Sequence, residues 1–270
     1  MALFLSVTAY QVTAYQGPAL PIHHASRSGI VSMETTEDLK VLAKELNPVL
    51  GFWDPLQLSG MDIYGMGEEG TVGWLRHAEI KHGRVAMAAF VGYCVQANGI
   101  HFPWSISSTM SYADIAAISS PAAQWDAVPT AGKLQIIGTI GLLEWFGEST
   151  YALEQSGEKH YMKGGKPGFY PSLKTAGIPH PVPFDLYNPF GLQSGMSEEK
   201  KAAALKAEIN NGRLAMLGIM GFMSASKGLY VPIMMSPAIT APYSGEVMAP
   251  FAASDVTLPL VADMLKWPFF

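Results

Sequence analysis

A ten-residue pattern occurs twice in this chain, and it constrains the fold more than any other feature. The first copy reads Glu79-Ile-Lys-His-Gly-Arg-Val-Ala-Met-Ala and the second reads Glu208-Ile-Asn-Asn-Gly-Arg-Leu-Ala-Met-Leu. Six of the ten positions are identical, and each copy opens a long apolar run. Internal repeats show how a fold is assembled. Because both copies set polar side chains into apolar runs, they predict a pair of related helices that share a polar contact.

Helical spacing gives the carboxylate and the arginine of each copy different partners. Residues three apart share one face of a helix, so each glutamate points the same way as His82 in the first copy or Asn211 in the second. Each arginine follows its own glutamate by five positions, about 140° around the helix, and must pair elsewhere. If the two helices cross about a local two-fold axis, the expected reciprocal ion pairs are Glu79 with Arg213 and Glu208 with Arg84.

The same side chains form a set of metal donors. A carboxylate neutralised by an arginine keeps a lone pair, as do an imidazole nitrogen and an amide oxygen, and such donors suit a hard cation such as Mg²⁺. The Mg²⁺ of a chlorophyll takes four nitrogens from its ring and needs one axial donor, which explains why the donors are dispersed. The sequence predicts that Glu79, His82, Glu208 and Asn211 are axial ligands to chlorophyll magnesium.

These segments resemble the light-harvesting chlorophyll-binding family, the three-helix antenna proteins of photosynthetic membranes. Residues 74–89 and 207–216 match the family's first and third helices, and residues 51–56 and 184–191 match the turns before them. The resemblance covers about residues 51–227 and is closer to the chlorophyll a/c branch than to the green-plant branch. It implies chlorophyll a, chlorophyll c and carotenoids of the fucoxanthin, peridinin or diadinoxanthin type as cofactors.

Three segments are candidates for membrane crossing, at about 72–98, 131–151 and 197–227. None is an uninterrupted apolar twenty-mer, so hydropathy alone leaves a soluble helical bundle open. The paired motifs favour an all-α membrane protein with three transmembrane helices. The first and third would cross as a pseudo-two-fold pair, and long loops would cover pigment. Ser197 is the expected N-cap of the third helix.

Further ligands follow from the resemblance. The family contributes a Gln and a Glu from its middle helix, which correspond here to Gln135 and Glu144, one residue further apart than in green plants. Gln96, which lies fourteen residues after His82, is a further candidate ligand. Its alternative role is a hydrogen bond from its amide to the backbone at a helix end. Glu148 and Lys133 are expected to be interfacial charges. The isolated histidines are assigned no ligand role: His77, His101, His160 and His180.

The chain is expected to have three regions. Residues 1–32 contain no acidic side chain and are typical of a plastid-targeting presequence or an N-terminal extension. Residues 33–235 would form the three-helix chlorophyll-binding domain. Residues 236–270 would form a tail at the membrane surface or against a neighbour.

The resemblance implies a photosynthetic antenna and not an enzyme. It would be a multi-pass protein of the plastid thylakoid membrane, with photosystem I or II, neighbouring antenna subunits and membrane lipids as partners. A net charge of −5 argues against nucleic acid. A photoprotective relative that dissipates excitation energy remains an alternative. A remote alternative is a di-iron enzyme, because Glu79 and His82 form half of such a site, although the second copy has Asn211 in place of histidine.

Overall fold

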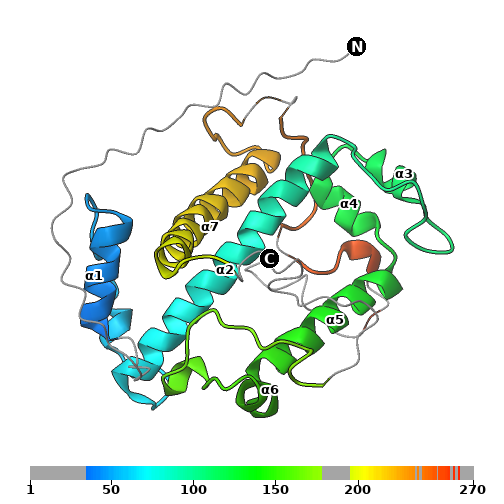
Figure 1. The fold of residues 1–270 in the computed structure, drawn as a ribbon. Helices are drawn as coiled ribbons and strands as arrows, with labels where there is room; N and C mark the ends of the chain where they lie inside the picture. The colour runs from blue at the N-terminus through cyan, green and yellow to red at the C-terminus, as the bar shows by residue number, and fades with distance from the viewer. Residues whose placement is uncertain are drawn as a thin grey trace. The chain divides into compact units, whose positions relative to one another are not determined.

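The computed structural model describes residues 35–177, 195–234, 236, 239–247, 249–255, 258 and 261, and the regular elements in these ranges are helices (Figure 1). This agrees with the predicted all-α class. The α-helices are α1 (Thr36–Leu46), α2 (Gly67–Ala97), α3 (Tyr112–Ala116), α4 (Pro121–Ala127), α5 (Thr130–Glu148), α6 (Thr150–Gln155) and α7 (Glu198–Ser226). The 3-10 helices are η1 (Leu58–Gly60), η2 (Tyr161–Lys163) and η3 (Ala253–Asp255). The expected presequence and the matched turn at 184–191 lie outside the described residues.

The three long helices α2, α5 and α7 lie where the sequence predicts them, with small differences at their ends. Ser197 caps α7, since its side chain accepts a hydrogen bond from the Lys200 amide at 3.4 Å. Helix α5 ends at Glu148, three residues before the expected position, because Ser149 caps α6 instead. Among the described helices, none is both long enough and apolar enough to qualify as a membrane span.

Helices α2 and α7 lie side by side, as Figure 1 shows. Their backbones meet at Gly83 and Gly212, the glycines of the two repeat copies. A Cβ atom added to Gly83 would lie 3.0 Å from the Gly212 Cα, and one added to Gly212 would lie 2.9 Å from the Gly83 Cα. Only hydrogen side chains permit this approach, so the repeat places a glycine in both helices at the point of closest contact.

Helix α5 makes no comparable backbone contact with the other long helices. A Cβ added to Gly138 or Gly141, in the middle of α5, would meet nothing within 4 Å. The apolar side chains of Leu142 and Trp145 are exposed. The described contacts of α5 lie near its two ends, so the middle of this helix presents an open apolar surface.

The start of α5 corrects one expectation. Lys133 is not an interfacial charge: its side chain is fully buried, with Nζ 2.6 Å from Asp255 Oδ2 and 2.9 Å from the Asp126 carbonyl. Thr130 also donates to Asp255. The lysine is buried because a residue near the other end of the chain supplies its counter-charge, which the local sequence could not reveal.

The described part of the C-terminal segment packs against helices of the same chain. The Tyr243 amide donates to the Ser226 carbonyl at 2.9 Å, at the end of α7. The Trp125 indole on α4 donates to the Pro250 carbonyl at 3.0 Å. Together with Asp255, these contacts bind the segment to α4, α5 and α7.

Candidate functional site

The crossing of α2 and α7 brings each repeat glutamate to the arginine of the other copy. Arg84 Nε lies 2.5 Å from Glu208 Oε1, and Arg213 Nε lies 2.7 Å from Glu79 Oε1. Both pairs flank the contact between the two glycines. The four side chains are half-buried, so the pairs compensate charge at the interface and fix the helices in one register.

The two halves of the site differ in their further partners. Buried Arg76 donates from Nη1 to Glu79 Oε2 at 2.6 Å, so both oxygens of Glu79 accept from arginine. Among the described residues, Glu208 Oε2 accepts no hydrogen bond. Each carboxylate oxygen has two lone pairs, so both glutamates keep donor capacity, with Glu208 the more open. The sequence reasoning missed Arg76, although its spacing of three from Glu79 could have indicated the pair.

His82 is held in the form that a metal ligand requires. Its Nδ1 lies 2.7 Å from the Ala78 carbonyl. A carbonyl only accepts, so Nδ1 carries a proton and Nε2 is the ring nitrogen left to bind a metal. The side chain is exposed on α2, as Asn211 is on α7.

Exposed apolar side chains lie beside both donors. Val85 follows His82 by three positions and is 69% exposed, and Leu214 follows Asn211 by three and is also 69% exposed. Leu217 and Met220 continue the exposed run on α7. Each nitrogen or oxygen donor therefore borders a helix face that a large apolar ring would cover, which fits a chlorophyll: one axial donor and an apolar surface.

The secondary candidates lie apart from the crossing. Gln96 is half-buried near the end of α2, and its main-chain carbonyl accepts a hydrogen bond from Gln124 Nε2 at 3.3 Å. Gln135 and Glu144 on α5 are exposed, because α5 does not pack this face against α2 or α7. Glu144 also forms an ion pair with Lys81 of α2.

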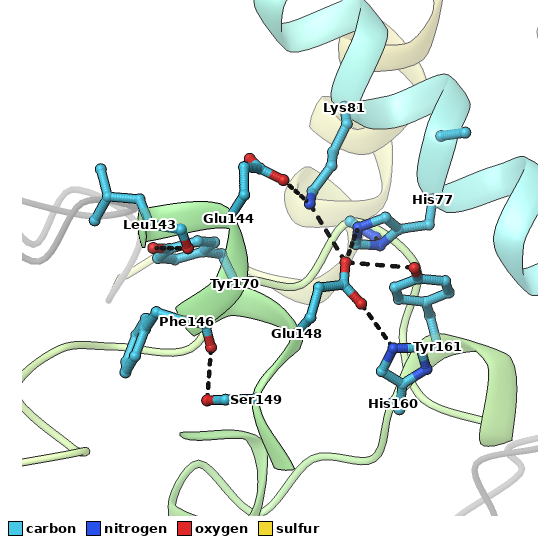
Figure 2. A network of polar contacts seen from close by, with 12 residues as sticks. His77, Lys81, Leu143, Glu144, Phe146, Glu148, Ser149, His160, Tyr161 and Tyr170 are labelled. Carbon is cyan, nitrogen blue, oxygen red and sulfur yellow. Dashed lines mark hydrogen bonds and ion pairs between the residues drawn. The ribbon is translucent and has the colours of Figure 1, made fainter. Parts of the chain in front are cut away.

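Glu148 is the centre of a polar network at the end of α5, shown in Figure 2. Its oxygens lie 2.7 Å from His160 Nε2, 3.3 Å from the Tyr161 hydroxyl and 3.5 Å from Lys81 Nζ. Glu148 is half-buried and joins α5 to α2 and to η2, so it has partners within the fold that the expectation of an interfacial charge did not include. Burial and the nearby Glu148 carboxylate raise the pKa of Tyr161, which keeps its hydroxyl neutral and able to donate.

His77 connects this network to the crossing. The buried His77 ring stacks on Tyr161 with centroids 3.8 Å apart, and its Nε2 lies 3.7 Å from Glu148 Oε1 (Figure 2). Its Nδ1 accepts from the Gly168 amide at 3.1 Å, and the Gly168 carbonyl accepts from Arg84 Nη1 at 2.6 Å. The Glu148 network is therefore joined to His77 through the stacked Tyr161 ring, and hydrogen bonds lead from His77 through one loop peptide to the arginine that pairs with Glu208.

Gly168 has a geometric reason to be glycine. Its φ is +76°, and a Cβ at this position would lie 2.7 Å from Cγ2 of Ile80. The glycine-rich loop was visible in the sequence, but its partners on α2 are distant in the chain and no local signal identifies them.

The described residues contain no group of three or more His, Cys, Asp or Glu side chains arranged to hold a metal ion. The single donors described above are a different case, because a chlorophyll brings four ligands of its own.

Comparison with known proteins identifies the family to which this chain is similar. The family described as chlorophyll A-B binding protein matches residues 39–227. A fucoxanthin-chlorophyll a-c binding protein of Trieres chinensis is 35% identical over 181 residues, which are 65% of this chain and 73% of that protein. Protein A of that name from Macrocystis pyrifera is 31% identical over 240 residues, 86% of this chain and 90% of its own. Protein C from Phaeodactylum tricornutum is 30% identical over 206 residues, 75% and 85% of the two chains.

The matched range contains both repeat copies, the crossing and the Glu148 network. The resemblance inferred from the sequence is confirmed, including its chlorophyll a/c branch. The chain belongs to the chlorophyll A-B binding protein family.

Proposed function

We propose that this protein is a photosynthetic antenna that binds chlorophylls and carotenoids, absorbs light and transfers excitation energy to a photosystem. One observation carries the proposal: a glycine-mediated helix crossing with reciprocal ion pairs, bordered by single donors beside exposed apolar faces. The family is a class of pigment-binding antenna proteins and not of enzymes. The names of the relatives support chlorophyll a, chlorophyll c and fucoxanthin as the pigments.

In this proposal Glu79, His82, Glu208 and Asn211 are axial ligands to chlorophyll magnesium. Arg84 and Arg213 neutralise the two carboxylates, which lets each glutamate act as a donor without an uncompensated charge. The lone pair of His82 is fixed by the Ala78 carbonyl. Gln96, Gln135 and Glu144 are further ligand candidates, and the exposure of the latter two leaves their side chains accessible to pigment.

Bound pigments supply the absorption of light and the excited state. The chain supplies their placement: the crossing fixes the donors of α2 and α7 relative to one another, and the apolar faces exclude water from the rings. Charges and hydrogen bonds around each ring tune its excitation energy. The different partners of Glu79 and Glu208 would give their pigments different excitation energies, despite the shared motif.

We also propose that α2, α5 and α7 cross the thylakoid membrane of the plastid. The relatives are named chloroplastic, which supports a plastid location. Helix α7 has 29 residues, or about 44 Å at 1.5 Å per residue, more than the ~30 Å hydrocarbon core, so it would tilt or protrude. Residues 1–32 would direct import. Photosystem I or II, neighbouring antennas and lipids are the proposed partners.

Refolding of the full chain with chlorophyll a, chlorophyll c and fucoxanthin tests the ligand assignment. We expect a pigment–protein complex, with less chlorophyll per protein in His82→Phe and in Asn211→Leu. The adjacent Asn210→Ala is the matched control and should keep the wild-type content, because Asn210 donates to the Leu46 carbonyl instead. A wild-type chain that refolds without pigment would overturn the proposed function, and unchanged chlorophyll in both ligand variants would overturn the assignment.

A further inference from the structure

His101 lies outside the repeat, in the loop after α2, yet its ring is held in the same form as that of His82. Its Nδ1 lies 2.9 Å from the Phe102 carbonyl, which can only accept a hydrogen bond. Nδ1 therefore carries a proton, which leaves Nε2 as the ring nitrogen that can bind a metal. The side chain is exposed, so this nitrogen is accessible to a ligand from outside the chain.

An exposed aromatic surface follows His101 directly. Phe102 and Trp104 stack with ring centroids 4.7 Å apart and an interplanar angle of 13°. They are 57% and 59% exposed, although aromatic rings of this size gain most from burial. The Tyr112 and Phe102 rings form a T-shaped pair with centroids 5.7 Å apart, so Tyr112 supports the stacked pair from one side. Such a surface beside a nitrogen donor fits a flat apolar ligand with a metal at its centre.

The loop holds the donor and the aromatic pair in place. At the end of α2, the Ile100 amide donates to the Val95 carbonyl at 3.2 Å, with Gly99 at a φ of +66°. Further along, the Tyr112 amide donates to the Trp104 carbonyl at 3.3 Å. A β-bridge joins Ser105 and Ser111. The site is therefore fixed to the end of α2 before any ligand binds, which lowers the entropic cost of binding.

The other described histidines outside the repeat lack this combination. His160 uses both ring nitrogens, since Nδ1 accepts from the Met162 amide at 3.3 Å and Nε2 donates to Glu148 at 2.7 Å. His77 is buried under Tyr161. Both lie in the network of Figure 2, where their role is structural.

We propose that His101 is the axial ligand of an additional chlorophyll, for which Phe102 and Trp104 provide the apolar surface. This inference rests on the proposed antenna function and extends it to a site outside the repeat. A chlorophyll fits because its magnesium needs one nitrogen or oxygen donor and its ring is flat and largely apolar. The site lies at the end of α2, away from the crossing, and would place one pigment at the edge of the protein.

The test refolds the full chain with chlorophyll a, chlorophyll c and fucoxanthin and compares wild type with His101→Phe, which removes the lone pair and keeps an aromatic ring. We expect one chlorophyll fewer per protein, with an unchanged far-ultraviolet circular dichroism spectrum. The difference spectrum should contain a single chlorophyll band. Thr109→Ala, in the same loop, controls for disturbance of the loop and should keep the wild-type content.

A second variant separates ligation from packing. His101→Gly should also lose the pigment, and imidazole added during refolding should restore it, because free imidazole can replace the missing donor. Wild-type chlorophyll content and spectrum in His101→Phe would overturn the inference and leave the antenna function intact. Loss of pigment from His101→Gly that imidazole does not restore would also overturn it, since the histidine would then act through the loop fold. A wild-type protein without chlorophyll would overturn the antenna function itself.

Discussion

The crossing of α2 with α7 and the attachment of α5 hold helices together in opposite ways. At the crossing, two backbones touch through Gly83 and Gly212, and the ion pairs lie on either side. Helix α5 has open space around its central glycines and is tied near its ends, by Lys133 to Asp255 and by Glu148 to the network of Figure 2. The contact between α2 and α7 is made by residues of the repeated motif. The attachment of α5 depends on side chains from loops that are distant in the chain.

The difference assigns separate roles to the two regions. The close crossing of α2 and α7 fixes the positions of the donors of the two repeat copies. His82 and Asn211 are exposed, so no space between the helices is needed for their ligands. A helix held at its ends keeps its middle surface available, and the exposed Leu142 and Trp145 are the side chains that pigments would cover in the proposed function. The predictions below disturb the two regions separately.

The largest effect is expected from Gly83→Ala. The added Cβ would lie 3.0 Å from the Gly212 Cα, so the helices must separate, at a cost of about 3 kcal/mol or more. Thermal unfolding of the refolded pigment complex, followed by circular dichroism, measures this loss. Gly92→Ala on the same helix is the control: its Cβ would meet nothing within 4 Å, and alanine favours a helix. Equal stability of the two variants would contradict the crossing.

Removal of the buried lysine of α5 should have the next largest effect. Lys133→Met leaves Asp255 buried without a counter-charge, which typically costs about 3 kcal/mol. Thermal unfolding again measures the loss. Lys40→Met, which breaks an exposed pair with Glu37, should change stability by at most about 0.5 kcal/mol. Lys133 would have no structural role if both variants unfolded at the wild-type temperature.

Acid titration provides a second test of the ion pair between Lys133 and Asp255. Burial would raise the pKa of Asp255, but hydrogen bonds from Lys133, Thr130 and the Ala252 amide outweigh it and hold the pKa below its usual value. A lowered carboxyl pKa contributes stability above the unfolded-state value of about 3.9 and loses it as the pH falls through the folded value. We expect acid destabilisation below about pH 4 that is reduced in Asp255→Asn. An identical pH profile in that variant would contradict the assignment.

The ion pairs at the crossing should matter more for stability than the histidine ligand. Glu208→Gln leaves Arg84 without its carboxylate and should cost about 2 kcal/mol, less than for a fully buried pair because about a quarter of each side chain is exposed. His82→Ala removes one donor and should reduce chlorophyll content more than stability. Refolding yield and pigment content measure both. A His82 variant that fails to fold beside a Glu208 variant that folds normally would reverse the ranking.

The smallest effect is expected at the network of α5. Glu148→Gln weakens the hydrogen bonds to His160 and Lys81 and should cost about 1 kcal/mol, since the carboxylate is partly exposed. Hydrogen exchange should become faster in the last turn of α5, with α2 unchanged. Glu144→Gln, at the more exposed pair with Lys81, is the control and should cost at most about 0.5 kcal/mol. Equal exchange in both variants would contradict a special role for Glu148.

The sequence predicted the crossing well because its determinants are local. The spacing of glutamate and arginine within each copy excludes pairing inside one helix, and the second copy offers the only symmetric partner. The start of α7 could also be predicted, since Ser197 and the acidic residues after it form a recognisable N-terminal cap. Arg76 was predictable by the same spacing rule but was missed.

The attachment of α5 could not be predicted because its partners are far away in the chain. Lys133 and Asp255 are separated by 122 positions, and a lysine at the start of an apolar helix ordinarily anchors it at an interface. His77 and Glu148 are each hydrogen-bonded to the loop that carries His160 and Gly168, which is distant from His77 in the chain. Contacts of this kind depend on tertiary packing and leave no periodic signal.

A fluorescence-excitation spectrum of the purified native protein, compared with its absorption spectrum, tests the central claim most directly. If the protein is a light-harvesting antenna, carotenoid and chlorophyll c bands will drive chlorophyll a emission with high efficiency. Pigments that absorb while emission is strongly quenched would contradict energy transfer and indicate a photoprotective protein. A colourless protein that folds without pigment would contradict the antenna function as a whole.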